Sequence, residues 1–192
     1  MELQHVNVKL FIAEPAELDL GALIPIFQQW IEAQVCEELL LDVADYRHVH
    51  GGPGVVLIGY QGDYSVDNTD NRLGVRYNRK AALDGRNQDR LRQATRAALS
   101  AFARLEAEPL LQGTLRFDGR EIEVFINDRL VAPNSDATRK AAEADLQTFF
   151  QQLFRERELS LSYASDPRRL FSVTAKASRQ LSVAELLANL DT

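Results

Sequence analysis

Cysteine is almost absent from this chain. Its 192 residues include only Cys36, so one copy can form no internal disulfide bond and no metal cluster built on cysteine. Two acidic residues, Glu37 and Glu38, follow directly, and their negative charge is expected to raise the pKa of the thiol, which disfavours a reactive cysteine. We interpret these two residues and Glu32 as solvated surface carboxylates.

Long apolar segments are also missing. The longest apolar run falls far short of the roughly 20 residues that span a bilayer as a helix. The amino-terminal stretch shows neither the basic leader nor the continuous apolar segment of a signal peptide. We therefore expect a cytoplasmic protein without a membrane partner.

Several signature motifs are missing as well. The chain has no P-loop, no glycine fingerprint for dinucleotides between a strand and a helix, no nucleophile elbow and no HExxH zinc motif. It also lacks a lysine-rich tail and a basic motif interleaved with aromatic residues. Nucleic acid is therefore not an expected partner, and no cofactor is expected apart from the metal alternative considered below.

Negative charge exceeds positive charge by six, but its distribution is uneven. Residues 1–71 carry 12 acidic and 2 basic side chains, residues 72–96 carry 2 and 8, and residues 97–192 carry 14 and 12. We expect the basic segment to meet the acidic first third, within one molecule or across a dimer. An anionic ligand is the alternative partner for that segment.

Period-two alternation and helical spacing predict strands joined mostly by turns, with three long helices between them. The predicted strands cover 5–12, 38–43, 55–60, 73–78, 122–127, 159–163 and 170–176. The long helices begin near Asp19, at Asn87 and at Ser135 or Asp136, and a short last helix begins at Ser182. Residues 62–71 are rich in Asp, Asn, Ser and Thr and are predicted to form a connection.

A hairpin is predicted over 114–125, because Asp118-Gly119 tolerates the positive φ of a type I′ turn. With it, the strands number about eight. The expected fold class is α+β: a mostly antiparallel sheet with the three long helices packed on one face, plus the short C-terminal helix. One domain is expected over 1–192.

The chain also contains a weak internal sequence repeat, which we call the echo. Alternating strands at 73–78 and 122–127 both end in asparagine, and each is followed by a basic residue, a long helix and a predicted hairpin. This pattern predicts two repeated strand–helix–strand–strand units, 72–127 and 122–177, and the first 61 residues follow the same order as a third candidate unit.

One candidate site is the segment from Asp42 to Gly54. His48 and His50 are two residues apart, so on extended backbone their imidazoles face the same way and could share a divalent metal with Asp42 or Asp45. These four residues are the candidate metal ligands, and His48, His50 and Asp45 are the candidate catalytic residues. The alternative interpretation is two surface histidines beside a turn that needs glycine.

A second candidate site lies at the ends of the two echoed strands. If the units are related by pseudo-symmetry, the turns that follow the strands occupy equivalent corners, where loops on a rigid scaffold gather binding residues. The candidate ligand-binding residues at these strand ends are Asn78, Arg79, Lys80, Asn127 and Arg129, and the binding of an anionic metabolite by the basic segment adds Arg72 and Arg76.

The leading functional hypothesis is a non-catalytic module that binds a protein partner or itself, as a homodimer joined through a sheet edge, a helix face or charge-complementary surfaces. One alternative is a metal-assisted hydrolase or small-ligand enzyme centred on residues 42–54. A second alternative is the binding of an anionic metabolite near residues 72–80.

Overall fold

The computed structural model of the protein describes residues 1–14 and 18–191. The strands among them are β1 (Val6–Ile12), β2 (Leu40–Tyr46), β3 (Gly54–Gly59), β4 (Gly62–Asp67), β5 (Gly74–Arg79), β6 (Phe117–Ile126), β7 (Ser160–Tyr163) and β8 (Phe171–Lys176). The α-helices are α1 (Leu23–Ala33), α2 (Asn87–Ala107), α3 (Asp136–Phe154) and α4 (Val183–Leu190), and the short 3-10 helices are η1 (Leu20–Ala22), η2 (Thr69–Asn71) and η3 (Pro109–Leu111). None of the described helices is both long and apolar enough to cross a membrane.

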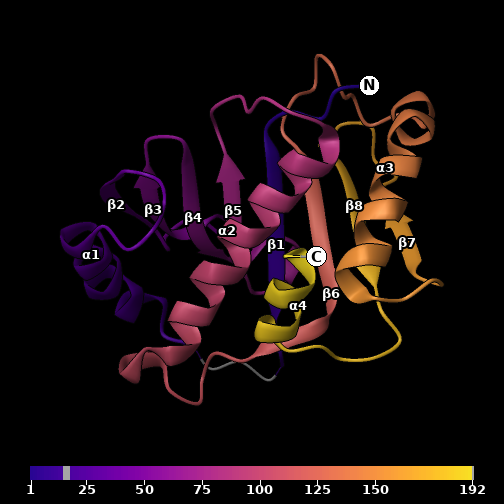
Figure 1. Ribbon diagram of the computed structural model, residues 1–192. Helices are drawn as coiled ribbons and strands as arrows, with labels where there is room; N and C mark the ends of the chain where they lie inside the picture. The colour runs from indigo at the N-terminus through magenta and orange to yellow at the C-terminus, as the bar shows by residue number, and fades with distance from the viewer. Residues whose placement is uncertain (15–17, 192) are drawn as a thin grey trace.

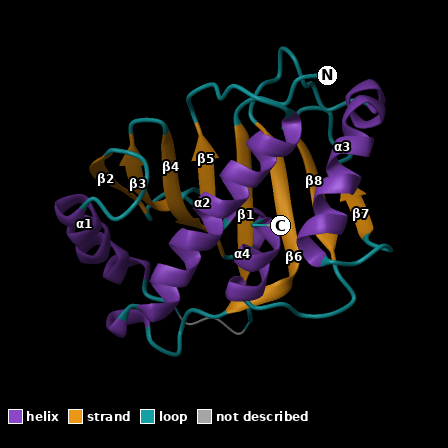
Figure 2. Ribbon diagram, in the orientation of Figure 1, coloured by secondary structure: helices purple, strands orange, loops and turns teal. Residues whose placement is uncertain are grey.

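All of these strands form one antiparallel sheet in the order β2-β3-β4-β5-β1-β6-β8-β7. The helices lie together on one side of it (Figure 1, Figure 2). Helix α1 packs on β2 and β3, α2 packs on β1 and β5, and α4 lies between α2 and α3. The predicted α+β fold class is confirmed. We call the sheet face opposite the helices the rear face.

Strand β1 is inserted between two strands that come much later in the chain. It runs antiparallel to both β5 and β6, so those two strands are parallel to each other. Helix α2 is the crossover between them, as the connection of parallel strands requires. The amino-terminal strand therefore occupies the centre of the sheet.

Both faces of β1 are buried. Val6, Val8 and Leu10 belong to the hydrophobic core under the helices, as the alternation predicts. Asn7 and Lys9 point to the rear face and are also buried, with 0% and 1% of their surface exposed. A layer of side chains must therefore cover the centre of the rear face.

The prediction of a hairpin over 114–125 is wrong. Strand β6 continues through Asp118-Gly119 without reversing its direction and pairs with β1 and β8, although its register against β1 shifts between Phe117 and Ile122. Gly119 has a different role, because a Cβ there would lie 1.8 Å from the backbone oxygen of Leu181. The Leu181 N–H donates to the Gly119 carbonyl at 3.1 Å, so the segment leading into α4 packs directly on the β6 backbone.

The connection predicted over 62–71 is also partly wrong, because its first six residues form β4. Tyr64 and Val66 point into the core, whereas Asp63 and Ser65 alternate with them. The strand was missed because its other face is polar and its ends are rich in residues that favour turns. The structure adds strand β4 and lacks the first strand of the predicted hairpin, so the predicted total of about eight strands is still right.

The echoed units differ in the structure. Residues 1–61 and 122–177 follow the order strand, helix, strand, strand. Residues 72–127 contain β5, α2 and β6 without a hairpin. The duplication therefore stays a prediction from the sequence.

Candidate functional site

A buried ion pair occupies the centre of the rear face. The Lys9 ammonium donates to Asp67 Oδ1 at 2.5 Å and to the Thr69 carbonyl at 3.3 Å. The two charged side chains expose only 2% and 1% of their surface. The Thr69 contact brings the β4–β5 connection over Lys9. Each charge neutralises the other, which makes the burial of both tolerable.

Two arginines complete this layer by crossing neighbouring strands. Arg76 begins on β5, yet its guanidinium carbon lies 4.5 Å from the ring centre of Phe125 on β6. Its side chain must cross β1, which lies between those strands. Arg72 lies 3.6 Å over the ring of Phe11 and donates to Glu121 at 2.7 Å. These stacked arginines shield the rear side of β1 from water.

Polar groups without partners lie beneath the arginines. Both side-chain amide atoms of Asn7 and the hydroxyl of Ser65 are buried and make no hydrogen bond to the described residues. Asn7 is opposite Asn78 on β5 and Phe125 on β6. Unsatisfied buried amides cost free energy and are rare in folded proteins. The centre of the rear face thus holds unused donors and acceptors.

A pocket of about 270 Å³ opens beside this layer, and we call it the arginine pocket. The described residues that line it are Thr69, Arg76, Phe125, Arg129, Arg168, Arg169, Leu170 and Ser172. Four of these eight are arginines and none is acidic. Phe125 and Ser172 face each other across β6 and β8, so an aromatic ring and a hydroxyl from the sheet contribute to the wall.

The four arginines are unequally neutralised. Ion pairs connect Arg168 with Asp166, Arg169 with Asp70, and Arg76 with Asp67. The last of these is the longest at 3.7 Å, and Asp67 is already bound to Lys9. Arg129 is exposed and has no ion pair or hydrogen bond from its side chain within the described chain. The cations therefore outnumber the carboxylates that pair with them.

The ligand residues predicted from the sequence are only partly brought together. Arg76 and Arg129, which are 53 positions apart in the chain, both line the arginine pocket. Asn78 accepts a hydrogen bond from Arg76 Nε at 2.8 Å and so holds that side chain in place. Arg72 lies in the stacked layer over Phe11.

The other three predicted ligand residues lie elsewhere. Arg79 is on the same side of β5 as the core residue Tyr77 and donates to the Ala81 carbonyl. Lys80 pairs with Asp63 at 2.7 Å. The backbone N–H of Asn127 donates to the His5 carbonyl, and its side chain is exposed. Asn78 and Asn127 therefore have different hydrogen-bond partners among the described residues.

The basic segment, residues 72–96, contacts the acidic first third of the same chain, which is the first of the two partners expected for it. Among the described residues, three ion pairs join these segments: Arg76 with Asp67, Lys80 with Asp63 and Arg90 with Glu2. Charge complementarity inside one molecule thus accounts for part of the uneven distribution.

The histidine segment does not assemble the predicted metal ligands. Among the described residues, no group of three or more His, Cys, Asp and Glu side chains is placed to hold a metal. His48 and His50 are exposed, and His48 stacks on Tyr46. Two charged hydrogen bonds from the Arg47 side chain lower the pKa of Asp45 to about 2. Asp42 caps its own neighbour, accepting from the Val43 N–H at 2.8 Å.

A second cluster of polar groups lies on the helix side of the sheet. Glu38 was expected on the surface, but only 3% of it is exposed. Its two carboxylate oxygens accept hydrogen bonds from the hydroxyls of Tyr64 and Tyr77, each at 2.5 Å. Gln93 donates to the Tyr77 hydroxyl at 3.2 Å, and its own side-chain oxygen is buried without a partner among the described residues. Gly62 makes room, because a Cβ there would lie 2.6 Å from the Tyr77 oxygen.

Burial dominates the acid–base behaviour of this cluster. It raises the pKa of Cys36 to about 11, opposed by a hydrogen bond with Tyr64 and reinforced by the charge of Glu38. Burial and the neighbouring Glu38 carboxylate also raise the pKa of both tyrosines. The thiol is therefore protonated at neutral pH, in agreement with the expectation of an unreactive cysteine.

Sequence reasoning missed both of these arrangements. The predicted strand over 38–43 begins at Glu38, and period-two spacing places Glu38 on the same side as the buried Leu40. That spacing was a usable signal. Arg168 and Arg169 form an adjacent basic pair ahead of β8, but only the pairing of β8 with β6 brings them to Arg129.

Comparison with known proteins adds no relative. No protein-family model matches the chain, and no curated protein matches it significantly.

Proposed function

We propose that the protein is a binding module for a small anion with at least two negative charges, which it holds in the arginine pocket. The observation that carries the proposal is the acid-free lining with four arginines, of which Arg129 has no partner in the described chain. Guanidinium groups match the planar geometry of carboxylate and phosphate and can bind them through two parallel hydrogen bonds.

The pocket also limits the size of its ligand. Its volume of about 270 Å³ corresponds to roughly nine water molecules at about 30 Å³ each. A phosphorylated metabolite or a polycarboxylate of similar volume is the class that fits. Phe125 offers an apolar surface for the carbon skeleton, whereas the Ser172 side chain is already hydrogen-bonded with the Glu123 carboxylate. A long polyanion gains little there, because the net charge of the chain is −6.

Isothermal titration with pyrophosphate and with citrate tests this proposal, with uncharged glycerol as the negative control. The key variant is Arg129→Gln, because it removes a charge without removing a hydrogen bond or ion pair of the fold. We expect it to weaken binding of the anions about tenfold, the usual effect of one charge-assisted contact. Arg157→Gln is the matched control, because that arginine is also exposed but lies outside the pocket.

Salt dependence provides a second reading of the same experiment. Binding through exposed guanidinium groups weakens as ionic strength rises, because mobile ions screen the charges. An affinity that does not change with ionic strength would contradict the proposal. An Arg129→Gln variant that binds the anions as tightly as the parent protein would also contradict it. So would equal losses in the Arg129→Gln and Arg157→Gln proteins.

A second proposal is self-association in the cytoplasm through the β2 side of the sheet. Large apolar side chains are exposed there: Leu39 at 57%, Leu41 at 50% and Tyr60 at 70%. Leu39 and Tyr60 are neighbours, since the Tyr60 N–H donates to the Leu39 carbonyl. A register shift between Leu40 and Asp42 disturbs the edge strand, which disfavours backbone pairing. We therefore propose a side-chain contact with a second copy of the chain.

Light scattering after gel filtration tests the second proposal. The parent protein is expected to form a dimer whose dissociation constant rises in Leu41→Lys, because a charge would be placed in an apolar contact. Leu130→Lys is the control, as Leu130 is 92% exposed in a different loop. A parent protein that stays monomeric at every concentration would rule this contact out.

A further inference from the structure

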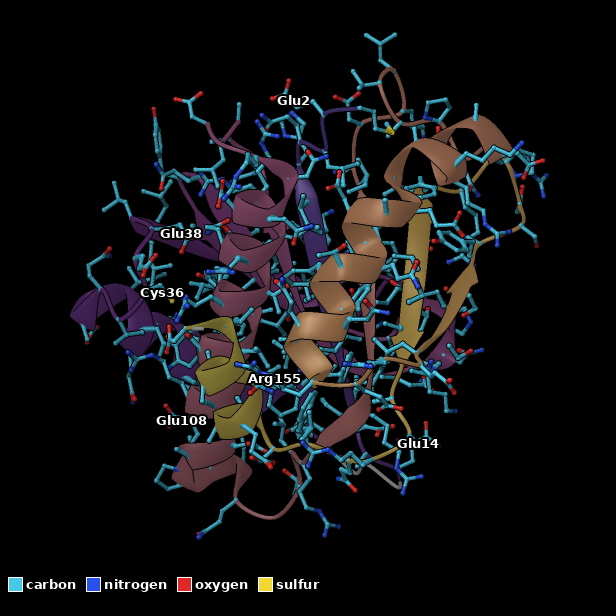
Figure 3. All side chains as sticks on the ribbon, turned by 45° about the vertical axis from the view of Figure 1, so that its right-hand side comes forward. Glu2, Glu14, Cys36, Glu38, Glu108 and Arg155 are labelled. Atoms are coloured by element: carbon cyan, nitrogen blue, oxygen red, sulfur yellow. The ribbon has the colours of Figure 1, made fainter. Side chains whose placement is uncertain are left out.

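Beside Glu38 the molecule contains a second pocket, which we call the Glu38 pocket. Its volume is about 180 Å³. The described residues that line it are Val35, Cys36, Glu37, Glu38, Tyr64, Arg96, Ala97, Ser100, Ala101 and Arg104. They come from the α1–β2 connection, from β4 and from one side of α2. Figure 3 shows the labelled Cys36 and Glu38 near α1 and beside α2.

The buried carboxylate of Glu38 lines this pocket and forms no ion pair with a described cation. Within the described chain, the oxygens of Glu38 accept hydrogen bonds only from the two neutral hydroxyls of Tyr64 and Tyr77. Each carboxylate oxygen can accept two hydrogen bonds, so one position on each remains. A buried carboxylate is stabilised by a nearby positive charge far more than an exposed one is. This carboxylate therefore favours a positively charged donor.

Two arginines from α2 also line this pocket. Arg104 is exposed, lies on α2 and forms no ion pair with a described carboxylate. Arg96, two helical turns earlier on the same helix, is held by Asp191 at 2.7 Å. Ala97 and Ala101 lie between the two arginines along α2 and are small. The lining thus combines the buried Glu38 and the exposed Glu37 carboxylates with the guanidinium group of Arg104, which has no ion pair among the described residues, and a short apolar surface.

We propose that the Glu38 pocket binds a free α-amino acid with a small side chain. Its ammonium group would bind to Glu38, its carboxylate would bind to Arg104, and its side chain would lie against the alanines of α2. The volume corresponds to roughly six water molecules at about 30 Å³ each, which suits alanine, serine or valine. This site lies on the helix side of the sheet, so the inference is independent of the arginine pocket.

Isothermal titration with L-alanine, L-serine and L-valine tests the proposal. Two analogues remove one charge each: alaninamide lacks the carboxylate and propionate lacks the ammonium group. We expect at least one of the amino acids to bind, and its binding to exceed that of either analogue by about tenfold or more. Alaninamide that binds as tightly as alanine would overturn the role of Arg104 and point to an amine site.

Variants locate the binding site. Arg104→Gln is expected to weaken amino-acid binding about tenfold while leaving the fold intact, because Arg104 holds no described carboxylate. Arg92→Gln, also on α2 but outside the pocket lining, is the matched control and should bind as the parent does. Glu38→Gln keeps the shape and removes the charge, so it is expected to abolish binding.

Some results would overturn the inference. No detectable binding of any of the three amino acids at millimolar concentration would do so, as would equal affinity in the parent and Arg104→Gln proteins. Circular dichroism of each variant shows whether it is folded. Should Glu38→Gln fail to fold, the comparison of Arg104→Gln with Arg92→Gln still decides the matter.

Discussion

Lys9 on β1 and Asp67 on β4 form a buried ion pair of 2.5 Å although β5 lies between their strands. Gly74 on β5 allows this contact, because a Cβ at that position would lie 2.8 Å from Lys9 Cε. The lysine side chain therefore passes directly over the glycine. This pair fixes the centre of the rear face on which the stacked arginines lie.

Removing one partner of this pair is expected to destabilise the protein strongly. Lys9→Met leaves the Asp67 carboxylate buried without its main cation, and a broken buried pair typically costs about 3–5 kcal/mol of unfolding free energy. Asp67→Leu should cost a comparable amount, because it leaves the ammonium group of Lys9 unpaired. Urea denaturation measures both losses.

The double variant Lys9→Met/Asp67→Leu checks the physical reason. Both charges are then absent, and apolar side chains occupy the same space, so we expect it to be more stable than either single variant. Losses that simply add in the double variant would show that the two residues act separately.

The fold was largely predictable from the sequence because its core follows simple periodicity. Alternation in β1 and β5 and apolar stripes on α2 and α3 are strong local signals, and the structure confirms those elements. The errors concern positions where one local pattern has two physical causes. Asp118-Gly119 fits a tight turn, yet the glycine is there for the close approach of Leu181.

The candidate sites were less predictable because they depend on contacts between distant strands. Arg129 was proposed from matching strand ends and Arg76 from the basic charge of its segment, and both line the arginine pocket. The insertion of β1 between β5 and β6, which brings Arg76 over Phe125, is a property of sheet order. Alternation within one segment carries no information about sheet order.

Gly119→Ala is expected to destabilise the attachment of α4 to the sheet. The new methyl group would meet the Leu181 backbone at 1.8 Å, and overpacking of this kind costs about 1–3 kcal/mol. Hydrogen exchange should show faster exchange in α4 than in the parent protein. Gly21→Ala is the comparison, because its nearest neighbour is the end of the flexible Arg47 side chain. Equal effects of the two substitutions would contradict this role of Gly119.

Tyr64→Phe and Tyr77→Phe should each reduce stability. Either change takes one hydroxyl away from the buried Glu38 carboxylate, and a hydrogen bond to a charged group contributes about 1.5–3 kcal/mol. Thermal or urea unfolding measures the loss. In a Glu38→Gln background each tyrosine substitution should cost less, because an amide needs less solvation than a carboxylate. Unchanged costs in that background would mean that the hydroxyls do not act through Glu38.

The raised pKa of Cys36 predicts a specific loss of stability in alkaline solution. Its pKa is 9.0 in the absence of the fold and about 11 in the folded protein, chiefly because burial disfavours the thiolate. Between pH 9 and pH 11 the unfolded chain therefore releases this proton while the folded chain keeps it. The folded state binds more protons in that window, so stability falls as the pH rises through it.

Comparison with Cys36→Ala isolates this contribution. Both proteins also lose stability as Tyr64 and Tyr77 ionise in the unfolded chain, because burial raises the pKa of those hydroxyls in the folded protein, and the charge of Cys36 adds to the rise at Tyr64 in the parent alone. The parent protein alone should show the additional decline between pH 9 and pH 11, so its stability relative to the variant should fall across this range and be constant below it. Alkylation of the folded thiol by iodoacetamide provides a direct check, with a midpoint expected near pH 11. A midpoint near pH 9 would mean that the thiol ionises as freely as it does in the unfolded chain.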